Sequence, residues 1–260
     1  MPNILDKIIA TKQQEVEQAK RLVLLSELEK RIALQRDPIS LRRSLETHKG
    51  GIISEFKRRS PSKDWIKQDG RVEDVIPAYE KAGAAGLSIL TDQQYFGGSL
   101  MDVVHARPLT SLPILRKEFV IDAYQLYEAR SVGADACLLI AAAIGAKRCQ
   151  ELAAEAHRIG LEVILEVHAL EELEAYSEYV DIIGVNNRNL KVFKTDPQQS
   201  VDLFSHLPKE ALPISESGLL DPLVAKHLQE IGYKGFLVGE AFMRTPKPGD
   251  ALASYIKQLS

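Results

Sequence analysis

The sequence predicts an α/β fold, a closed (β/α)8 barrel (TIM-barrel architecture) with an N-terminal helical extension, in one domain of residues 1–260. Eight short apolar runs, each followed by a helical pattern, begin about 20 to 35 residues apart, the length of a βα unit. No Gly/Pro linker or low-complexity segment divides the chain. Such alternation implies a parallel sheet with right-handed crossovers. Eight units favour a barrel over an open doubly wound sheet, and no Gly-rich dinucleotide fingerprint follows the first strand.

The elements begin with two helical segments, approximately Ile4–Val23 and Leu25–Leu34, which precede Pro38 and the first strand. Because the first strand follows so closely, we expect residues 1–48 to pack on the barrel as an extension rather than to form a domain. The simplest role for this extension is a cap over the barrel floor.

The expected strands and helices then alternate. The strands are Gly51–Lys57, Gly86–Thr91, Pro113–Lys117, Ala136–Ala141, Leu161–Val167, Asp181–Asn186, Leu212–Glu216 and Gly235–Gly239. The amphipathic stretches between them include Val72–Ala82, Ala123–Val132, Ala146–Ile159, Leu170–Tyr179 and Leu223–Ile231. Several of these end at a glycine, the usual signal for a helix C-terminus.

Composition and charge exclude several classes of function. The net charge of −3 gives no reason to expect a nucleic-acid partner. The longest apolar stretch, from Ala136 to Ala146, is too short to cross a bilayer, and the N-terminus has no signal-peptide pattern. We therefore expect no membrane partner and a cytoplasmic location, where Cys137 and Cys149 would stay reduced rather than form a disulfide.

Polar side chains concentrate where the expected strands end. In a barrel, the carboxyl ends of the strands form the face that carries catalytic residues. Glu55 and Lys57 are two residues apart at the end of the first strand, so they share one face of it. A ring at this mouth would hold Glu55, Lys57, Lys117, Glu166, Asn186 and Glu216. A surface ion pair is the more common explanation for any one of them, but the whole set favours an active site.

Two further features suit an anionic ligand. The last two strands run into Glu216-Ser217-Gly218 and Val238-Gly239-Glu240-Ala241, and glycine lets backbone N–H groups approach a phosphate closely. Ordinary turns are the alternative explanation. The basic segment 58–63 lies in a connection of about 14 residues, a length typical of functional lids. A solvated charge run remains the alternative there.

The histidines give little sign of a metal site. His168 lies two residues after Glu166, but no third ligand stands at a suitable position. We therefore expect no metal.

Eight segments closely resemble the indole-3-glycerol phosphate synthase family. They are Ile53–Ser62, Ile89–Ser99, Leu115–Phe119, Gly133–Ile140, Leu165–His168, Gly184–Leu190, Ser215–Gly218 and Gly235–Gly239. The resemblance involves every expected strand and so covers nearly the whole chain, and the segments at the first and third strands are highly specific. It implies a lyase of tryptophan biosynthesis that converts 1-(2-carboxyphenylamino)-1-deoxyribulose 5-phosphate to indole-3-glycerol phosphate, losing carbon dioxide and water. It implies no metal or organic cofactor.

The resemblance also implies catalytic roles at the strand ends. Lys117 matches the general acid, and Lys57 matches a second lysine near the substrate carboxylate that is available as an acid in the dehydration. Glu166 matches the general base or proton shuttle of the dehydration. Glu55 would hold the two lysines in place. Asn186 and Glu216 would hydrogen-bond the reacting centre and the ribulose hydroxyls.

The remaining matches concern substrate binding. Arg188 would reach the anthranilate carboxylate, and the apolar slot for the ring would comprise Phe96, Phe119 and Leu138. The phosphate would lie at Ser60, Ser217, Gly218, Gly239 and Glu240. Some relatives carry serine where this chain has Glu240. Since a carboxylate would repel the phosphate, we expect only the backbone N–H of Glu240 to contribute, with its side chain turned away.

Two alternative functions stay open at this point. One keeps the barrel but makes Lys117 a Schiff-base nucleophile, as in a sugar-phosphate aldolase. The other is an inactive scaffold subunit, which would be expected to have lost charged residues at its strand ends. The sequence leaves the oligomeric state undetermined, with a monomer slightly favoured.

Overall fold

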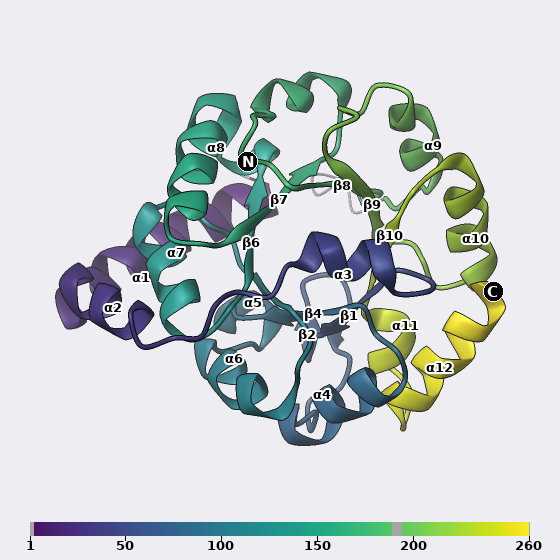
Figure 1. Ribbon diagram of the computed structural model, residues 1–260, viewed down its shortest axis with the longest axis horizontal. Helices are drawn as coiled ribbons and strands as arrows, with labels where there is room; N and C mark the ends of the chain where they lie inside the picture. The colour runs from purple at the N-terminus through teal and green to yellow at the C-terminus, as the bar shows by residue number, and fades with distance from the viewer. Residues whose placement is uncertain (1–2, 189–193, 260) are drawn as a thin grey trace.

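The computed structural model describes residues 3–188 and 194–259. The last two residues of the 184–190 motif lie outside the described residues. Eight parallel strands close into a barrel in the order β1-β10-β9-β8-β7-β6-β5-β4 (Figure 1). Their bounds are β1 Ile52–Phe56, β4 Gly86–Leu90, β5 Ile114–Lys117, β6 Ala136–Ile140, β7 Glu162–Val167, β8 Ile182–Asn186, β9 Leu212–Glu216 and β10 Gly235–Val238. The predicted closed (β/α)8 barrel is thus confirmed.

Helices surround the barrel in chain order. They are α4 Val72–Lys81, α5 Gln93–Phe96, α6 Leu100–Ala106, α7 Ala123–Ser131, α8 Ala141–Arg158, α9 Gln198–Phe204, α10 Pro222–Ile231, α11 Glu240–Met243 and α12 Pro248–Leu259, with the 3-10 helices η1 Arg107–Leu109 and η2 Leu170–Ala175. A small hairpin pairs β2 Arg59–Ser60 with β3 Asp64–Trp65. No helix in the described ranges is both long and apolar enough to span a bilayer.

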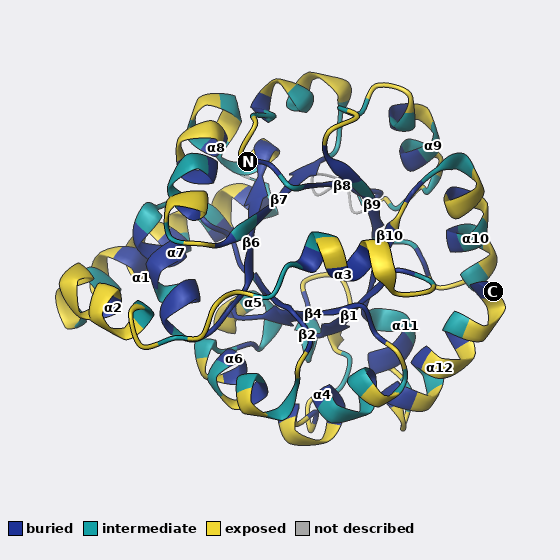
Figure 2. Cartoon of the chain, viewed as in Figure 1, coloured by how far each residue is buried: buried dark blue, intermediate teal, exposed yellow. Residues whose placement is uncertain are grey.

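The alternation of side chains along each strand separates two apolar layers. On β6, Ala136, Leu138 and Ile140 face the barrel interior, whereas Cys137 and Leu139 face the surrounding helices. Figure 2 shows the strands buried, while exposed residues lie mainly on the helices. Both Cys137 and Cys149 are buried free thiols. The interior is therefore a packed core rather than a pore, and space for a ligand exists only at its ends.

The N-terminal segment contains three helices, α1 Ile4–Leu22, α2 Leu25–Ile32 and α3 Leu41–Thr47, of which we had not expected α3. It is α3 that crosses the centre of the ring of strands in Figure 1. Its Leu41 and Leu45 join the interior cluster, beside Gly86 and Gly235 at the amino-terminal ends of their strands. The floor is therefore covered by α3.

Helix α1 lies toward the opposite end of the barrel, contrary to our expectation of a floor cap. Its Lys12 forms ion pairs with Asp92 and Glu118, which follow the carboxyl ends of β4 and β5. Its Leu5 and Ile8 pack in the interior cluster. Because Lys12 is only 2% exposed, these ion pairs fix the helix against the mouth.

Two connections differ from the predicted helices. The stretch 170–179 forms only η2, and the Glu172 carboxylate accepts a hydrogen bond from the His168 N–H (2.6 Å), which ties this short crossover to the end of β7. Helix α8 begins at Ala141, five positions before the predicted start at Ala146, and is interrupted at Gly145, whose φ is 75°. The alanine-rich segment after β6 is thus already helical before the glycine interrupts it.

Candidate active site

The period of two along the strands places polar side chains directly above the packed interior. On β5, Leu115 belongs to the interior cluster and Lys117 is the next residue on the same face; Ile164 and Glu166 are related in the same way on β7. On β9, Ile214 and Glu216 repeat the pattern. The residues predicted from strand ends thus converge at the mouth.

The Lys117 ammonium lies between two carboxylates. Its Nζ is 2.5 Å from Glu216 Oε2 and 3.3 Å from Glu166 Oε2. Gly184 on β8 explains how Glu216 fits, because a Cβ at that position would clash with the Glu216 carboxylate. These contacts hold the ammonium near the axis of the barrel mouth.

A second ion pair joins Lys57 to Glu55 at the end of β1. Glu55 is 4% exposed and lies against Gly239, where an added Cβ would come 2.5 Å from Glu55 Oε1. Gly239 therefore lets the loop after β10 approach the carboxylate. The mouth thus holds three buried carboxylates around two ammonium groups.

This imbalance of charge separates the pKa values of the carboxylates. Burial acts to raise the pKa of Glu166, but Lys117, His168 and a hydrogen bond from Asn186 together lower it. For Glu216, burial and the neighbouring Glu166 and Glu55 outweigh Lys117, raising its pKa to about 7. The pKa of Lys117 is raised, because its carboxylate neighbours outweigh its burial. Glu166 therefore stays ionised, and Lys117 stays a protonated acid.

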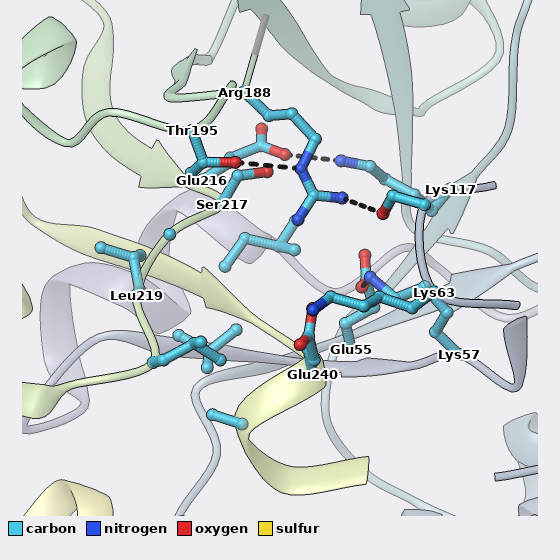
Figure 3. A pocket seen from close by; sticks show the side chains of 17 residues that line it. Glu55, Lys57, Lys63, Lys117, Arg188, Thr195, Glu216, Ser217, Leu219 and Glu240 are labelled. Carbon is cyan, nitrogen blue, oxygen red and sulfur yellow. Dashed lines mark hydrogen bonds and ion pairs between the residues drawn. The ribbon is translucent and has the colours of Figure 1, made fainter. Parts of the chain in front are cut away.

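A cavity of about 540 Å³ opens above these groups (Figure 3). At one side it is lined by Ser217 and Gly218 after β9 and by Gly239 and Glu240 after β10. Ser217 and Gly218 both have left-handed backbones, with φ of 66° and 74°. Consecutive residues in a turn conformation expose their backbone N–H groups, and these groups bind anions well. This side of the cavity suits a phosphate.

The buried side chain of Asn187 stabilises the turn at Ser217 and Gly218. Its amide nitrogen donates to Ser215 Oγ (2.9 Å) and to the Ser217 carbonyl (3.0 Å), and its oxygen accepts from Ser200 Oγ (2.8 Å). We had not singled out Asn187. It is only 1% exposed, so its side chain acts on the loop rather than on a ligand.

A narrower apolar slot of about 90 Å³ adjoins the cavity and shares Lys117, Glu55 and Arg188 with it. Phe96, Phe119 and Leu138 line the slot, as we expected for an aromatic ring. The two phenylalanine rings lie 5.9 Å apart between centroids. The polar cavity and the apolar slot therefore meet at Lys117.

Arg188 extends across the entrance between the loops. Its Nε donates to Thr195 Oγ1 (3.3 Å), an interaction drawn in Figure 3, and its Nη1 lies 3.4 Å from Ser62 Oγ. Its backbone N–H donates to Asn186 Oδ1 (3.0 Å). The guanidinium is thus positioned beside both spaces, where it could meet a ligand carboxylate.

Of the residues predicted for the site, Ser60 is the one that the structure does not place on either cavity. Ser60 pairs with Asp64 in the β2–β3 hairpin and is 2% exposed, so its hydroxyl is enclosed. The hairpin turn instead brings Ser62 and Lys63 to the cavity. Figure 3 also draws the Glu240 side chain along the cavity, so it does not turn away as its charge led us to expect.

Other supporting residues were also missed. Arg58 forms a two-pronged ion pair with Asp102 on α6 (2.6 and 2.8 Å), which anchors the start of the basic segment 58–63. Lys12 acts through partners distant in sequence, Asp92 and Glu118. His168 acts through neighbours close in sequence, Glu166 and Glu172. The basic segment itself was a visible signal for Arg58, whereas nothing in the local pattern identifies the partner of Lys12. Over the described part of the chain, no group of three side chains could hold a metal ion.

Comparison with known proteins identifies the same family that the sequence segments resemble. The family model described as indole-3-glycerol phosphate synthase matches residues 5–255. A protein of that name from Bacteroides thetaiotaomicron is 51% identical, with all of both chains covered. Another, from Burkholderia ambifaria, is 42% identical over 97% of this chain and 98% of its own.

Solved structures with low identity support the fold alone. A thiamine phosphate pyrophosphorylase from Pyrococcus furiosus has a TM-score of 0.62 at 17% identity, covering 85% of this chain and 98% of its own. A tryptophan synthase α-subunit from the same organism has a TM-score of 0.60 at 14% identity, covering 82% and 98%.

Proposed function

Since this chain belongs to the indole-3-glycerol phosphate synthase family, we propose that the barrel mouth converts 1-(2-carboxyphenylamino)-1-deoxyribulose 5-phosphate to indole-3-glycerol phosphate, with the residues described above in distinct roles. The observation that carries the proposal is the position of Lys117. Its ammonium lies where a phosphate-sized polar cavity meets a slot lined by two aromatic rings. The substrate needs both environments, one at each end.

The first step joins the ring carbon that bears the carboxylate to the ketone carbon. Negative charge grows on the ketone oxygen, and Lys117 donates a proton to it. Carbon dioxide then leaves, and its bonding electrons restore the aromatic ring. The raised pKa of Lys117 suits an acid and disfavours the neutral amine that a Schiff-base aldolase would need.

The second step removes the new hydroxyl as water. An acid protonates the hydroxyl, a role open to Lys57, and Glu166 takes a proton from the carbon next to nitrogen. Glu166 suits this role because its pKa is lowered although it is buried. Over both steps, the acids donate two protons and the base takes one. Together with the loss of carbon dioxide from an ionised carboxylate, this balances the reaction.

The remaining residues would bind and orient the substrate. Glu55 would hold Lys57, and Asn186 and Glu216 would bond the reacting centre and the ribulose hydroxyls. Arg188 would meet the anthranilate carboxylate between the two spaces. The turns at Ser217–Gly218 and Gly239–Glu240 would take the phosphate through backbone N–H groups. Residues 1–48 would serve as an extension of the barrel domain, with α1 supporting the mouth.

The direct test supplies the carboxyphenylamino-deoxyribulose phosphate and follows the appearance of indole fluorescence. We expect turnover without an added metal or cofactor. Borohydride added with substrate should leave Lys117 unmodified. A covalent adduct on Lys117 would contradict its role as an acid and restore the aldolase alternative.

A further inference from the structure

His168 is a buried histidine at the mouth that the mechanism above does not use. It follows β7 and lies two positions beyond Glu166, and its side chain is 12% exposed. It lies on neither of the two cavities, so it stands behind Glu166 relative to a bound substrate. Its backbone is fixed on both sides: its N–H donates to Glu172 Oε2 (2.6 Å) and its carbonyl accepts from Gln199 Nε2 (2.6 Å).

The ring of His168 lies between two carboxylates. Its Nε2 is 3.5 Å from Glu166 Oε1, and its Nδ1 is 3.5 Å from Glu172 Oε2. These are ion-pair distances, and within the described residues neither ring nitrogen makes a shorter hydrogen bond. The charged groups that face the ring are thus Glu166 from β7, Glu172 from η2 and, farther away, Glu216 from β9. All are acidic, so this environment favours an imidazolium with both nitrogens protonated.

The two oxygens of Glu166 consequently face different cations. Oε1 faces His168, whereas Oε2 faces Lys117 at 3.3 Å. Lys117 must give up its proton during the reaction, and at that moment the carboxylate loses one of its two positive neighbours. His168 lines neither cavity, so in the proposed reaction it keeps its charge throughout.

We propose that His168 is a positioning residue that, as an imidazolium, holds the Glu166 carboxylate ionised and correctly oriented while Lys117 donates its proton. The inference rests on the role of Glu166 as the base in the proposed function. In this arrangement, His168 holds one oxygen of the Glu166 carboxylate throughout the reaction, while the other oxygen faces Lys117.

The electrostatics of the site agree with this geometry. The pKa of His168 is raised, because Glu172, Glu166 and Glu216 together outweigh its burial. The same contact lowers the pKa of Glu166. Replacing His168 with a neutral side chain should therefore raise the pKa of Glu166.

The test measures kcat and KM from about pH 5 to 9 for two variants that separate the two ring nitrogens. H168Q keeps a neutral donor near the Nε2 position, facing Glu166, and H168N keeps one near Nδ1, facing Glu172. We expect kcat to fall about ten-fold or more in H168N and less in H168Q, with KM within about two-fold of the parent. In both, the acid limb of the kcat profile should move up by about one pH unit.

The matched control is H157Q. His157 on α8 pairs with Asp181 at 2.9 Å near the start of β8, with its side chain 35% exposed. The same chemical change there should leave both the acid limb and kcat unchanged. Thermal melting of each variant separates loss of fold from loss of turnover.

Glu166→Gln, alone and combined with H168N, completes a double-mutant cycle. Once Glu166 can no longer ionise, H168N should cost nothing further. Full turnover in E166Q would refute the role of Glu166 as the base. Loss of turnover in E166Q, together with H168Q and H168N profiles that superimpose on the parent, would refute the role of His168 alone. A fall in kcat with no shift of the acid limb would mean a merely structural role and would also overturn the inference.

Discussion

The buried ammonium of Lys12 gives the sharpest prediction about stability. Its Nζ lies 2.8 Å from Asp92 Oδ2, 3.1 Å from Glu118 Oε1 and 2.6 Å from Glu15 Oε2. Asp92 and Glu118 are 0% and 4% exposed, so Lys12→Met would leave Asp92 buried without its cation and Glu118 with only Arg116, at 3.8 Å. Removing one partner of a buried ion pair costs about 3 to 5 kcal/mol. At about 2 to 4 °C per kcal/mol for a chain of this size, Tm should fall by about 10 °C.

The same substitution should also weaken substrate binding. Asp92 caps α5 by accepting from the N–H groups of Tyr95 and Phe96, and Glu118 accepts from the N–H of Phe119. Lys12 thus ties together the two backbones that carry the rings of the slot. We expect KM to rise more than kcat falls.

Circular dichroism melting and steady-state kinetics would measure both effects. Lys20→Met is the control, because Lys20 lies on the same helix and pairs with Asp122 at 2.9 Å, but with its side chain 37% exposed. Such a surface pair contributes about 0 to 1 kcal/mol. Equal melting temperatures for the two variants would refute the reasoning. Lowering the pH should narrow the difference, because Lys12 and the other partners of Glu118 outweigh burial and lower the pKa of Glu118, so the stability from this pair is lost as the pH falls.

Three further predictions concern the mouth. Lys117→Ala should lower turnover by about 10²- to 10⁴-fold while the folded circular dichroism spectrum persists, and near-normal turnover would contradict its assignment. Glu240→Ser should preserve or modestly improve competitive inhibition by inorganic phosphate; a large rise in the inhibition constant would mean that the glutamate side chain takes part in binding. Because the pKa of Glu216 is raised to about 7, its neutral form stabilises the fold at low pH, and this contribution declines as pH rises from about 4.5 through 7. In urea unfolding, the free energy of unfolding of Glu216→Gln should therefore rise relative to that of the parent from pH 5 to 8. A difference that stays constant with pH would contradict the raised pKa.

The strands and their polar ends could be predicted from sequence because both depend on short-range patterns. Residues such as Leu115 and Lys117 reveal their shared face by a spacing of two, whatever the rest of the chain does. The carboxyl ends of parallel strands must then meet at one face. The barrel then follows from the count of eight βα units with right-handed crossovers, and the ring of charges from where the strands end.

What sequence analysis missed depends on distant partners or on tight turns. The contact of Lys12 with Glu118 spans the chain from α1 to the end of β5, and no periodicity encodes it. Ser60 was misplaced because a two-residue pairing with Asp64 reverses the chain, which the basic composition of the segment obscured. The stretch 170–179 has helical composition, but the structure holds only the 3-10 helix η2 there, tied to the end of β7 by the bond from the His168 N–H to Glu172.

Helix α3 covers the floor of the barrel and so limits how molecules reach and leave the site. Leu41 and Leu45 close one end of the barrel, and apolar side chains fill its interior. Reactant and products must therefore enter and leave through the same mouth. In the proposed reaction, carbon dioxide and water would leave through this mouth, past the bulkier indole product. We therefore expect departure of the indole product to complete each cycle, and the hairpin that carries Ser62, which lines the cavity, to influence its rate.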